Sequence, residues 1–409
     1  MKPKLRRFQI TPIEQNGDEF LLLHDPMGIA ADAGVPRELG YLLSLFDGTR
    51  TYDEIIVDYK KLGGEELPAW FIEKTVNDLD ENYMIESPRL EARLREVERN
   101  PVRPAVLAGL SYPADAQQLR AQLNGFSQKA QKLMPSSTRN GGTMPPGKLR
   151  GIVVPHIDFT RGGVVEALAY EPLKTEEFDV LVVLGIAHCG VRYPFCAAPK
   201  DFETPLGTAP CDRDFIAALQ ERVGERLTRE QIAHKNEHSI EFVAVFLQHF
   251  EQFKNTRIVP IICGGFFDEI QSGDSPSRNE DIAQFIRALR EVTHEWESRG
   301  QRVGFIASVD GAHVGTQFGD PRVLTPARLQ AIESGDRQFW RHVEAGDAEA
   351  MHAHIARDNN ERNVDAHPAL YTLLTAFPEL RGQLLHYAQA YNREQNIVVS
   401  FAAMSLHEA

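Results

Sequence analysis

The stretch GIVVPHIDFTRGG, residues 151–163, decides how the larger part of this chain folds. Its first five residues are largely apolar and β-branched, and His156 follows them at once. Comparable apolar runs occupy residues 180–184, 258–263, 303–308 and 397–401. Short runs that are almost continuously hydrophobic are typical of strands covered on both faces. The sequence therefore predicts several buried strands after residue 150.

Amphipathic stretches separate these runs and have the spacing of helices. The predicted helices cover residues 215–223, 240–250, 282–293 and 328–343. Alternating strands and helices favour an α/β fold in which a central, mostly parallel sheet is flanked by helices. We expect this α/β domain to span residues 105–409.

Residues 1–90 form a second predicted domain. A strand at residues 20–24 precedes helices at 37–46, 51–63 and 68–80, and residues 83–85 form a returning strand. This order predicts a small winged-helix-like α+β domain. Residues 91–104 are charged and then reach two prolines, as expected of a linker. Residues 127–150 are a predicted loop, either a lid or a simple insertion.

The overall composition excludes some classes of function. The 409 residues carry a formal net charge of −14, so we expect no nucleic-acid partner. No apolar run approaches the roughly 20 residues of a membrane span. The four cysteines include no CxxC pair, which favours free thiols in a reducing compartment. We therefore expect a soluble, cytoplasmic protein that does not enter membranes.

Histidines follow three of the five apolar runs. His156 comes directly after the first, His188 follows the second by a few residues, and Asp310 and His313 follow the run at 303–308. Because ligands collect beyond the carboxyl ends of strands in open α/β sheets, these residues predict a shared pocket. Imidazole is the commonest metal ligand, and two histidines with one carboxylate suit Fe(II). A hydrogen-bonded polar network without any ligand is the alternative interpretation.

A further candidate is the segment NEHSIE at residues 236–241, which begins a predicted helix. The positive end of the helix favours the neutral form of His238 beside Glu237. A neutral histidine next to a metal pocket can act as a general base.

Several blocks of the sequence resemble the Memo family, whose bacterial members are called protein B of the AmmeMemoRadiSam system. The blocks are Leu110–Asp115, Val154–Gly163, Leu184–His188, Thr204–Gly207, Glu237–Glu241, Ile258–Ile261, Ser308–Gly315, Ala366–Ala369, Leu385–Gln389 and Val399–Ala403. The resemblance implies a fold shared with class III extradiol dioxygenases. It places His156 and His188 at the positions of the two metal-binding histidines and His238 at that of the acid/base.

One position departs from the family pattern. The family tends to carry a cysteine as third candidate ligand immediately before the residue that is His313, and this chain has Ala312 there. Alanine cannot bind a metal, so Asp310, His313 or His238 would have to replace it. The resemblance thus implies metal ligands His156, His188 and His313, catalytic residues His238, Glu237 and Asp310, and Fe(II), Cu or Zn as the metal.

The first fifth of the chain resembles the PqqD-like domains, on the segments Leu43–Ile56 and Leu79–Ile85. That resemblance implies peptide binding by addition of a strand to a sheet edge. The AmmeMemoRadiSam resemblance implies a radical-SAM companion protein. Two hypotheses of function follow: a binding protein with a vestigial pocket, which the missing cysteine favours, or a metal-dependent oxidoreductase of the class III extradiol type.

Overall fold

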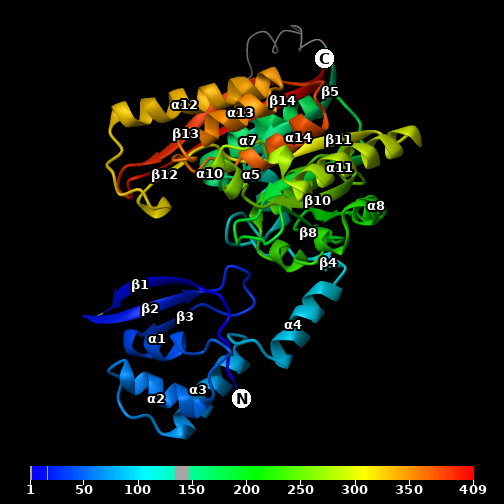
Figure 1. Ribbon diagram of the computed structural model, residues 1–409. Helices are drawn as coiled ribbons and strands as arrows, with labels where there is room; N and C mark the ends of the chain where they lie inside the picture. Colours follow the sequence, from blue (N-terminus) through cyan, green and yellow to red (C-terminus); the bar gives the residue numbers. More distant parts are fainter. Residues whose placement is uncertain (1, 16, 134–146) are drawn as a thin grey trace. The chain divides into compact units, whose positions relative to one another are not determined.

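The computed structural model describes residues 2–15, 17–133 and 147–409, which form two compact units, Met1–Asn100 and Pro101–Ala409 (Figure 1). The units divide between Asn100 and Pro101, within the range predicted as a linker. The predicted loop at residues 127–150 lies largely outside the described residues. Its first part differs from the prediction, because helix α5 continues to Leu133, and strand β5 begins at Lys148.

The first unit consists of a three-stranded antiparallel sheet followed by helices. Its elements are β1 Gln9–Gln15, β2 Asp18–His24, β3 Ala33–Pro36, α1 Arg37–Ser44, α2 Tyr52–Lys61, α3 Ala69–Glu81 and α4 Pro88–Arg99. The Thr51 side chain accepts from the backbone of Glu54 while Glu54 bonds back to Thr51, so α2 begins with a capping box. Buried Leu23, Ile55 and Ile72 belong to the core that joins sheet and helices.

The strands of this unit differ from the prediction. One strand was expected before the helices and three are present. The sequence QITPIEQ of β1 contains a proline, and residues 9–14 are all exposed, so no apolar alternation marks it as a strand. The predicted return strand at residues 83–85 is reduced to one bridge between Leu5 and Ile85.

The second unit is built on an eight-stranded mixed sheet in the order β12-β14-β5-β11-β6-β10-β7, with β13 paired to β14. The four central strands run parallel: β5 Lys148–Val154, β11 Val303–Ser308, β6 Val180–Ile186 and β10 Arg257–Cys263. The outer strands are antiparallel to their neighbours: β7 Phe195–Ala197, β12 His313–Gly315, β13 Leu380–Asn392 and β14 Ile397–Glu408. The prediction of a mostly parallel sheet therefore holds only for its centre.

Helices cover both faces of this sheet. They are α5 Ala116–Leu133, α7 Phe159–Leu173, α8 Arg213–Val223, α9 His238–His249, α10 Phe267–Ser272, α11 Glu280–Ser298, α12 Pro326–Ala345, α13 Ala348–Ala356 and α14 His367–Ala376. Short 3-10 helices lie at Glu225–Leu227, Gln231–His234, Glu251–Phe253, Pro276–Arg278 and Thr316–Phe318. A small second sheet joins β4 Val102–Arg103, β8 Asp201–Thr204 and β9 Gly207–Ala209.

Two buried clusters fill the space between the sheet and its helices. Val182 and Phe305 belong to one cluster, and their strand neighbours Val183 and Ile306 belong to the other. This alternation is expected because successive side chains of a strand point to opposite faces. Among the described residues, no helix has both the length and the apolar character that crossing a membrane requires.

A buried histidine near the start of α9 predicts acid sensitivity of the fold. His234 is 1% exposed, and its Nε2 lies 2.9 Å from the carbonyl oxygen of Cys196. Burial lowers its pKa from 6.5 to about 4, so the unfolded chain takes up a proton first as the pH falls. The contribution of neutral His234 to the free energy of unfolding is complete above pH 6.5, and it is lost as the pH falls towards 4. We expect the free energy of unfolding to drop by about 2 kcal/mol from this group between pH 7 and pH 5.

The measurement is urea unfolding at both pH values. His234→Gln should remove this share of the acid sensitivity, because glutamine keeps a hydrogen-bond donor and does not titrate. An equal loss of stability in the parent protein and in His234→Gln would contradict the assignment.

Candidate metal centre

His156 stands at the carboxyl end of β5 and is 1% exposed. Its Nδ1 lies 2.9 Å from the carbonyl oxygen of Ser308, at the end of β11. A carbonyl oxygen can only accept, so Nδ1 carries the proton when the ring is neutral, and Nε2 carries the lone pair. Nε2 is buried and has no hydrogen-bond partner among the described residues. The local structure thus presents a free nitrogen of His156 to the interior of the site.

His188 follows β6 and is oriented by a carboxylate. Its Nδ1 lies 3.0 and 3.1 Å from the two carboxylate oxygens of Glu237. Glu237 caps α9 by accepting from the backbone of Ser239 at 2.9 Å, and it also accepts from the backbone of His188 at 3.0 Å. A carboxylate on one imidazole nitrogen is the usual partner of a histidine that binds metal through the other nitrogen. Glu237, predicted as catalytic, thus contacts His188 and the first turn of α9.

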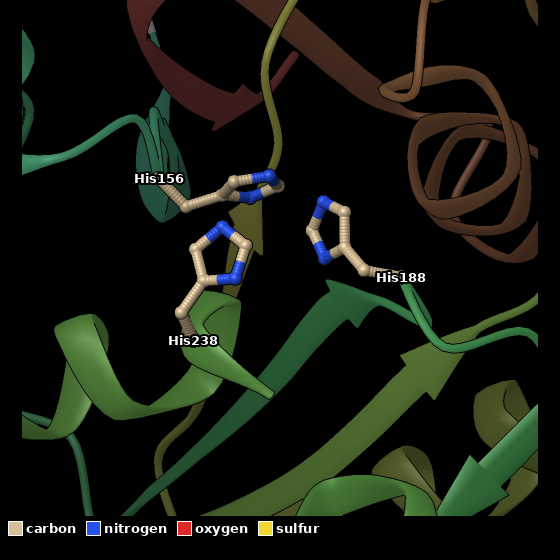
Figure 2. A group of neighbouring side chains, drawn as sticks. All are labelled: His156, His188 and His238. Atoms are coloured by element: carbon tan, nitrogen blue, oxygen red, sulfur yellow. The ribbon is translucent and has the colours of Figure 1, made fainter. Parts of the chain in front are cut away.

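His238 is the first residue of α9 and joins the other two histidines (Figure 2). The His188 and His238 rings stack with centroids 4.4 Å apart, and the His156 ring lies 5.1 and 5.0 Å from them. One candidate ligand atom from each histidine lies within 4.8 Å of the other two. Burial lowers the pKa of His238 to about 3, so this ring is neutral and its nitrogen lone pair is available.

Two carboxylates lie next to His156. Asp365 Oδ2 lies 3.3 Å from His156 Nε2, and Asp310 Oδ2 lies 3.8 Å from the same atom. Asp310 also accepts from the backbone of His156 at 3.1 Å, and Asp365 accepts from the backbone of Asp310 at 2.8 Å. Like His156 Nε2, Asp365 Oδ2 is buried without a hydrogen-bond partner among the described residues. The two atoms form a buried ion pair when His156 is protonated, and a cation that replaces this proton would find a nitrogen and a carboxylate ligand side by side.

The charges of this group explain the direction of its pKa shifts. Burial works to lower the pKa of His156, but Asp310 and Asp365 outweigh it and raise the pKa to about 10. Burial raises the pKa of Asp310. For Asp365 the effect of burial is outweighed by His156, and the pKa is lowered. Asp365 is therefore the carboxylate that is held ionised beside the histidines.

His313 and Ala312 lie beside this group. His313 lines the pocket, its Nε2 is 3.9 Å from Asp365 Oδ2, and its Nδ1 is 3.2 Å from the carbonyl oxygens of Gly311 and Asn363. The three-histidine group contains His238 in the place where we expected His313. Ala312 is fully buried and packs in a core cluster.

The pocket around these residues has a volume of about 370 Å³. Its lining includes His156, His188, His238, Asp310 and His313, together with the apolar residues Leu107, Ile157, Phe242, Phe318, Ile397 and Val399. Mostly apolar walls with a few placed polar groups are typical of small-molecule sites. As predicted from the strand ends, residues that follow β5, β6 and β11 line this pocket.

A buried ion pair fixes the helix that carries Glu237 and His238. Glu241, one turn into α9, is fully buried and accepts from the Arg103 guanidinium and the Tyr112 hydroxyl, and from the backbone of Leu107 at 3.0 Å. Arg103 also donates to the carbonyl oxygens of His234 and Glu237, at 3.1 and 2.9 Å. The guanidinium thus ties β4 to the first turn of α9 and sets the position of the site.

Another buried network holds the loop after β11. Ser400 on β14 donates to Asp336 at 2.6 Å, and its hydroxyl accepts from the backbone of Ala312 at 2.7 Å. The Tyr387 hydroxyl donates to the same carboxylate oxygen at 2.9 Å. These contacts fix the backbone next to Asp310 and His313 from the opposite side of the sheet.

The sequence prediction missed Asp365 and Arg103. Asp365 directly precedes the block Ala366–Ala369, which we noted only as a mark of family resemblance. No spacing rule connects it to His156, because the chain between them includes most of the second unit. Arg103 fell within the predicted linker, where a charged residue is expected to be solvated, although it is 2% exposed.

Comparisons with known proteins agree with this architecture. The family model for the Memo-like protein matches residues 103–405. A MEMO1 family protein of Aquifex aeolicus is 31% identical over 413 residues, covering 99% of either chain. MEMO1 family proteins of Thermus thermophilus and Pyrococcus furiosus are 27% and 26% identical, over 82% and 75% of this chain and 93% and 100% of their own. The chain belongs to the Memo family.

Proposed function

We propose that the protein is a metal-dependent oxidoreductase that holds Fe(II) through His156, His188 and Asp365. The observation that carries the proposal is the pairing of two oriented histidines with a buried carboxylate oxygen, Asp365 Oδ2, that no hydrogen bond engages among the described residues. Ser308 and Glu237 occupy Nδ1 of His156 and His188, and Asp365 Oδ2 lies 3.3 Å from His156 Nε2. Two histidines and one carboxylate suit non-haem Fe(II), and imidazole also binds Cu and Zn.

The carboxylate removes the main argument for a vestigial pocket. Ala312 replaces the cysteine of the family pattern, but Asp365 places an anionic ligand atom beside His156. Asp310 is the weaker candidate, because its nearer oxygen is 3.8 Å away and its other oxygen accepts from the His156 backbone. In this proposal Asp365 supplies the anionic ligand that the cysteine would supply in the family pattern.

Each residue of the centre has a distinct task in this proposal. A bound Fe(II) would supply open positions for oxygen and substrate and act as a Lewis acid. Glu237 orients His188, while Ser308 fixes the tautomer of His156. Neutral His238, next to both rings, can take a proton from a substrate hydroxyl. Phe242 and Phe318 line the pocket and exclude water from it.

The test is nitric oxide binding by the full chain after anaerobic loading with Fe(II). Nitric oxide occupies the positions that oxygen would use and gives a paramagnetic signal with Fe(II). We expect this signal in the parent protein and in Asp310→Asn, and its loss in Asp365→Asn. Iron binding without nitric oxide binding would contradict an oxygen-activating site. Equal signals in Asp365→Asn and the parent protein would exclude Asp365 as a ligand.

A second candidate function concerns the first unit. We propose that β1 binds an extended peptide by strand addition, in line with the PqqD-like and winged-helix-like resemblance. Among the residues of this unit that the structure describes, β1 pairs only with β2, and Ile10 and Ile13 are 55% and 37% exposed. Peptides selected from a random library on the full chain should lose binding to the double variant Ile10→Lys/Ile13→Lys. Unchanged binding would contradict this use of β1.

A further inference from the structure

The pocket of the metal centre continues into a second hollow. This outer hollow is bordered by the tip of the β13–β14 hairpin, residues 389–395, and has a volume of about 860 Å³. Arg161, Gln317 and Ile397 line both spaces. A ligand that enters the pocket from this direction passes these three side chains.

The Arg161 guanidinium is held in place through its Nε, while its two Nη groups are available to a ligand. It lies in the first turn of α7, and its Nε donates to Asp158, the residue that caps this helix. The other carboxylate oxygen of Asp158 accepts from the backbone of Thr160 and Arg161, at 3.1 and 3.2 Å. The two Nη groups have no hydrogen-bond partner within residues 2–15, 17–133 and 147–409. The guanidinium therefore keeps free the pair of donors that suits a carboxylate or a phosphate.

The other residues that line the pocket indicate the chemistry of the rest of the ligand. Six apolar side chains line the pocket, whereas Gln317 at its mouth has an amide without a partner in the described part of the chain. Asp310 and Asp365 lie at the inner end, where they repel a second anionic group unless a metal neutralises them. An anionic group is thus favoured at Arg161 and an apolar body farther in.

We propose that the pocket takes a small organic anion, a carboxylate or a phosphate monoester with an apolar body, whose charged group binds Arg161. This inference rests on the proposed function for the identity of the site, and it names the class of substrate. Arg161 is a binding residue in this scheme, and it fixes which end of the ligand faces His156, His188 and His238. Gln317 donates a further hydrogen bond at the mouth.

The test uses phenylacetate, phenyl phosphate and the neutral phenylacetamide as probes, with binding to the full chain measured by calorimetry. At least one anion should bind, and phenylacetamide should bind about tenfold or more weakly than it. Arg161→Gln should weaken the anion by about 10–100-fold, and Arg161→Lys by less, because lysine keeps the charge but loses the paired donors. The matched control is Arg393→Gln, which lines only the outer hollow and should change little.

Each other outcome overturns the proposal. No binding of either anion, equal binding of phenylacetamide, or unchanged affinity in Arg161→Gln would exclude an anion site at Arg161. Binding that is lost in His156→Ala/His188→Ala but kept in Arg161→Gln would assign the anion to the metal instead. Metal content should be the same in Arg161→Gln and the parent protein. A failure of the metal centre therefore appears in the metal measurement, and a failure of the anion site appears in the probe titration.

Discussion

The double variant His156→Ala/His188→Ala is expected to lose near-stoichiometric binding of Fe(II) and Zn(II), with an affinity lowered by more than about 100-fold. The reason is that both side chains present a free Nε2 to the same space, while Ser308 and Glu237 hold their other nitrogens. Truncation removes both imidazole ligands and leaves only His238 and the carboxylates. Metal content after anaerobic loading and gel filtration measures the effect.

The matched control is the double variant His249→Ala/His342→Ala. Both of these histidines are half-buried, and neither lines the pocket. Metal content should be unchanged in this variant. Retention of stoichiometric metal by His156→Ala/His188→Ala, with a native circular dichroism spectrum, would show that the metal binds elsewhere.

Replacing Glu241 with alanine is expected to destabilise the second unit by about 3–5 kcal/mol. The substitution leaves the Arg103 guanidinium buried without its counter-charge, and it removes the acceptor of the Tyr112 hydroxyl. Equilibrium unfolding in urea measures the loss. Metal affinity should fall as well, because the same contact sets the first turn of α9 and with it Glu237 and His238.

The double variant Arg103→Met/Glu241→Leu distinguishes the effect of an unpaired buried charge from the effect of lost packing. Replacing both partners of a buried pair by apolar residues of similar size costs far less than removing one. We expect this variant to be more stable than Glu241→Ala. A single variant Glu241→Ala as stable as the parent protein would mean that the pair does not hold β4 to α9.

The parts of the site that could be predicted are those encoded next to a strand end. His156 directly follows one apolar run and His188 comes a few residues after another. Both runs were predicted as buried strands, and the rule for open α/β sheets then brings the two histidines together. His238 could be predicted because it lies in the segment that begins a predicted helix. Each of these predictions needed only a local pattern and a general rule of topology.

The missed parts depend on contacts between distant segments. Asp365 reaches His156 because the chain returns through α12 and α13 before it passes the site. Strand β13 has half-buried side chains instead of an apolar run, since its hairpin with β14 lies outside the parallel centre. Arg103 looked like a solvated charge because its partner, Glu241, lies far along the chain. Local sequence carries no signal for such pairings.

The metal centre at His156, His188 and Asp365 is tested most directly by X-ray absorption at the zinc edge of the full chain loaded with one equivalent of Zn(II). We expect a shell of nitrogen and oxygen at about 2.0–2.1 Å, with the outer-shell pattern of at least two imidazoles. A sulfur neighbour at about 2.3 Å would contradict it, because Cys189, next to His188, would then be a ligand. A spectrum without imidazole scattering would likewise exclude the centre formed by His156, His188 and Asp365.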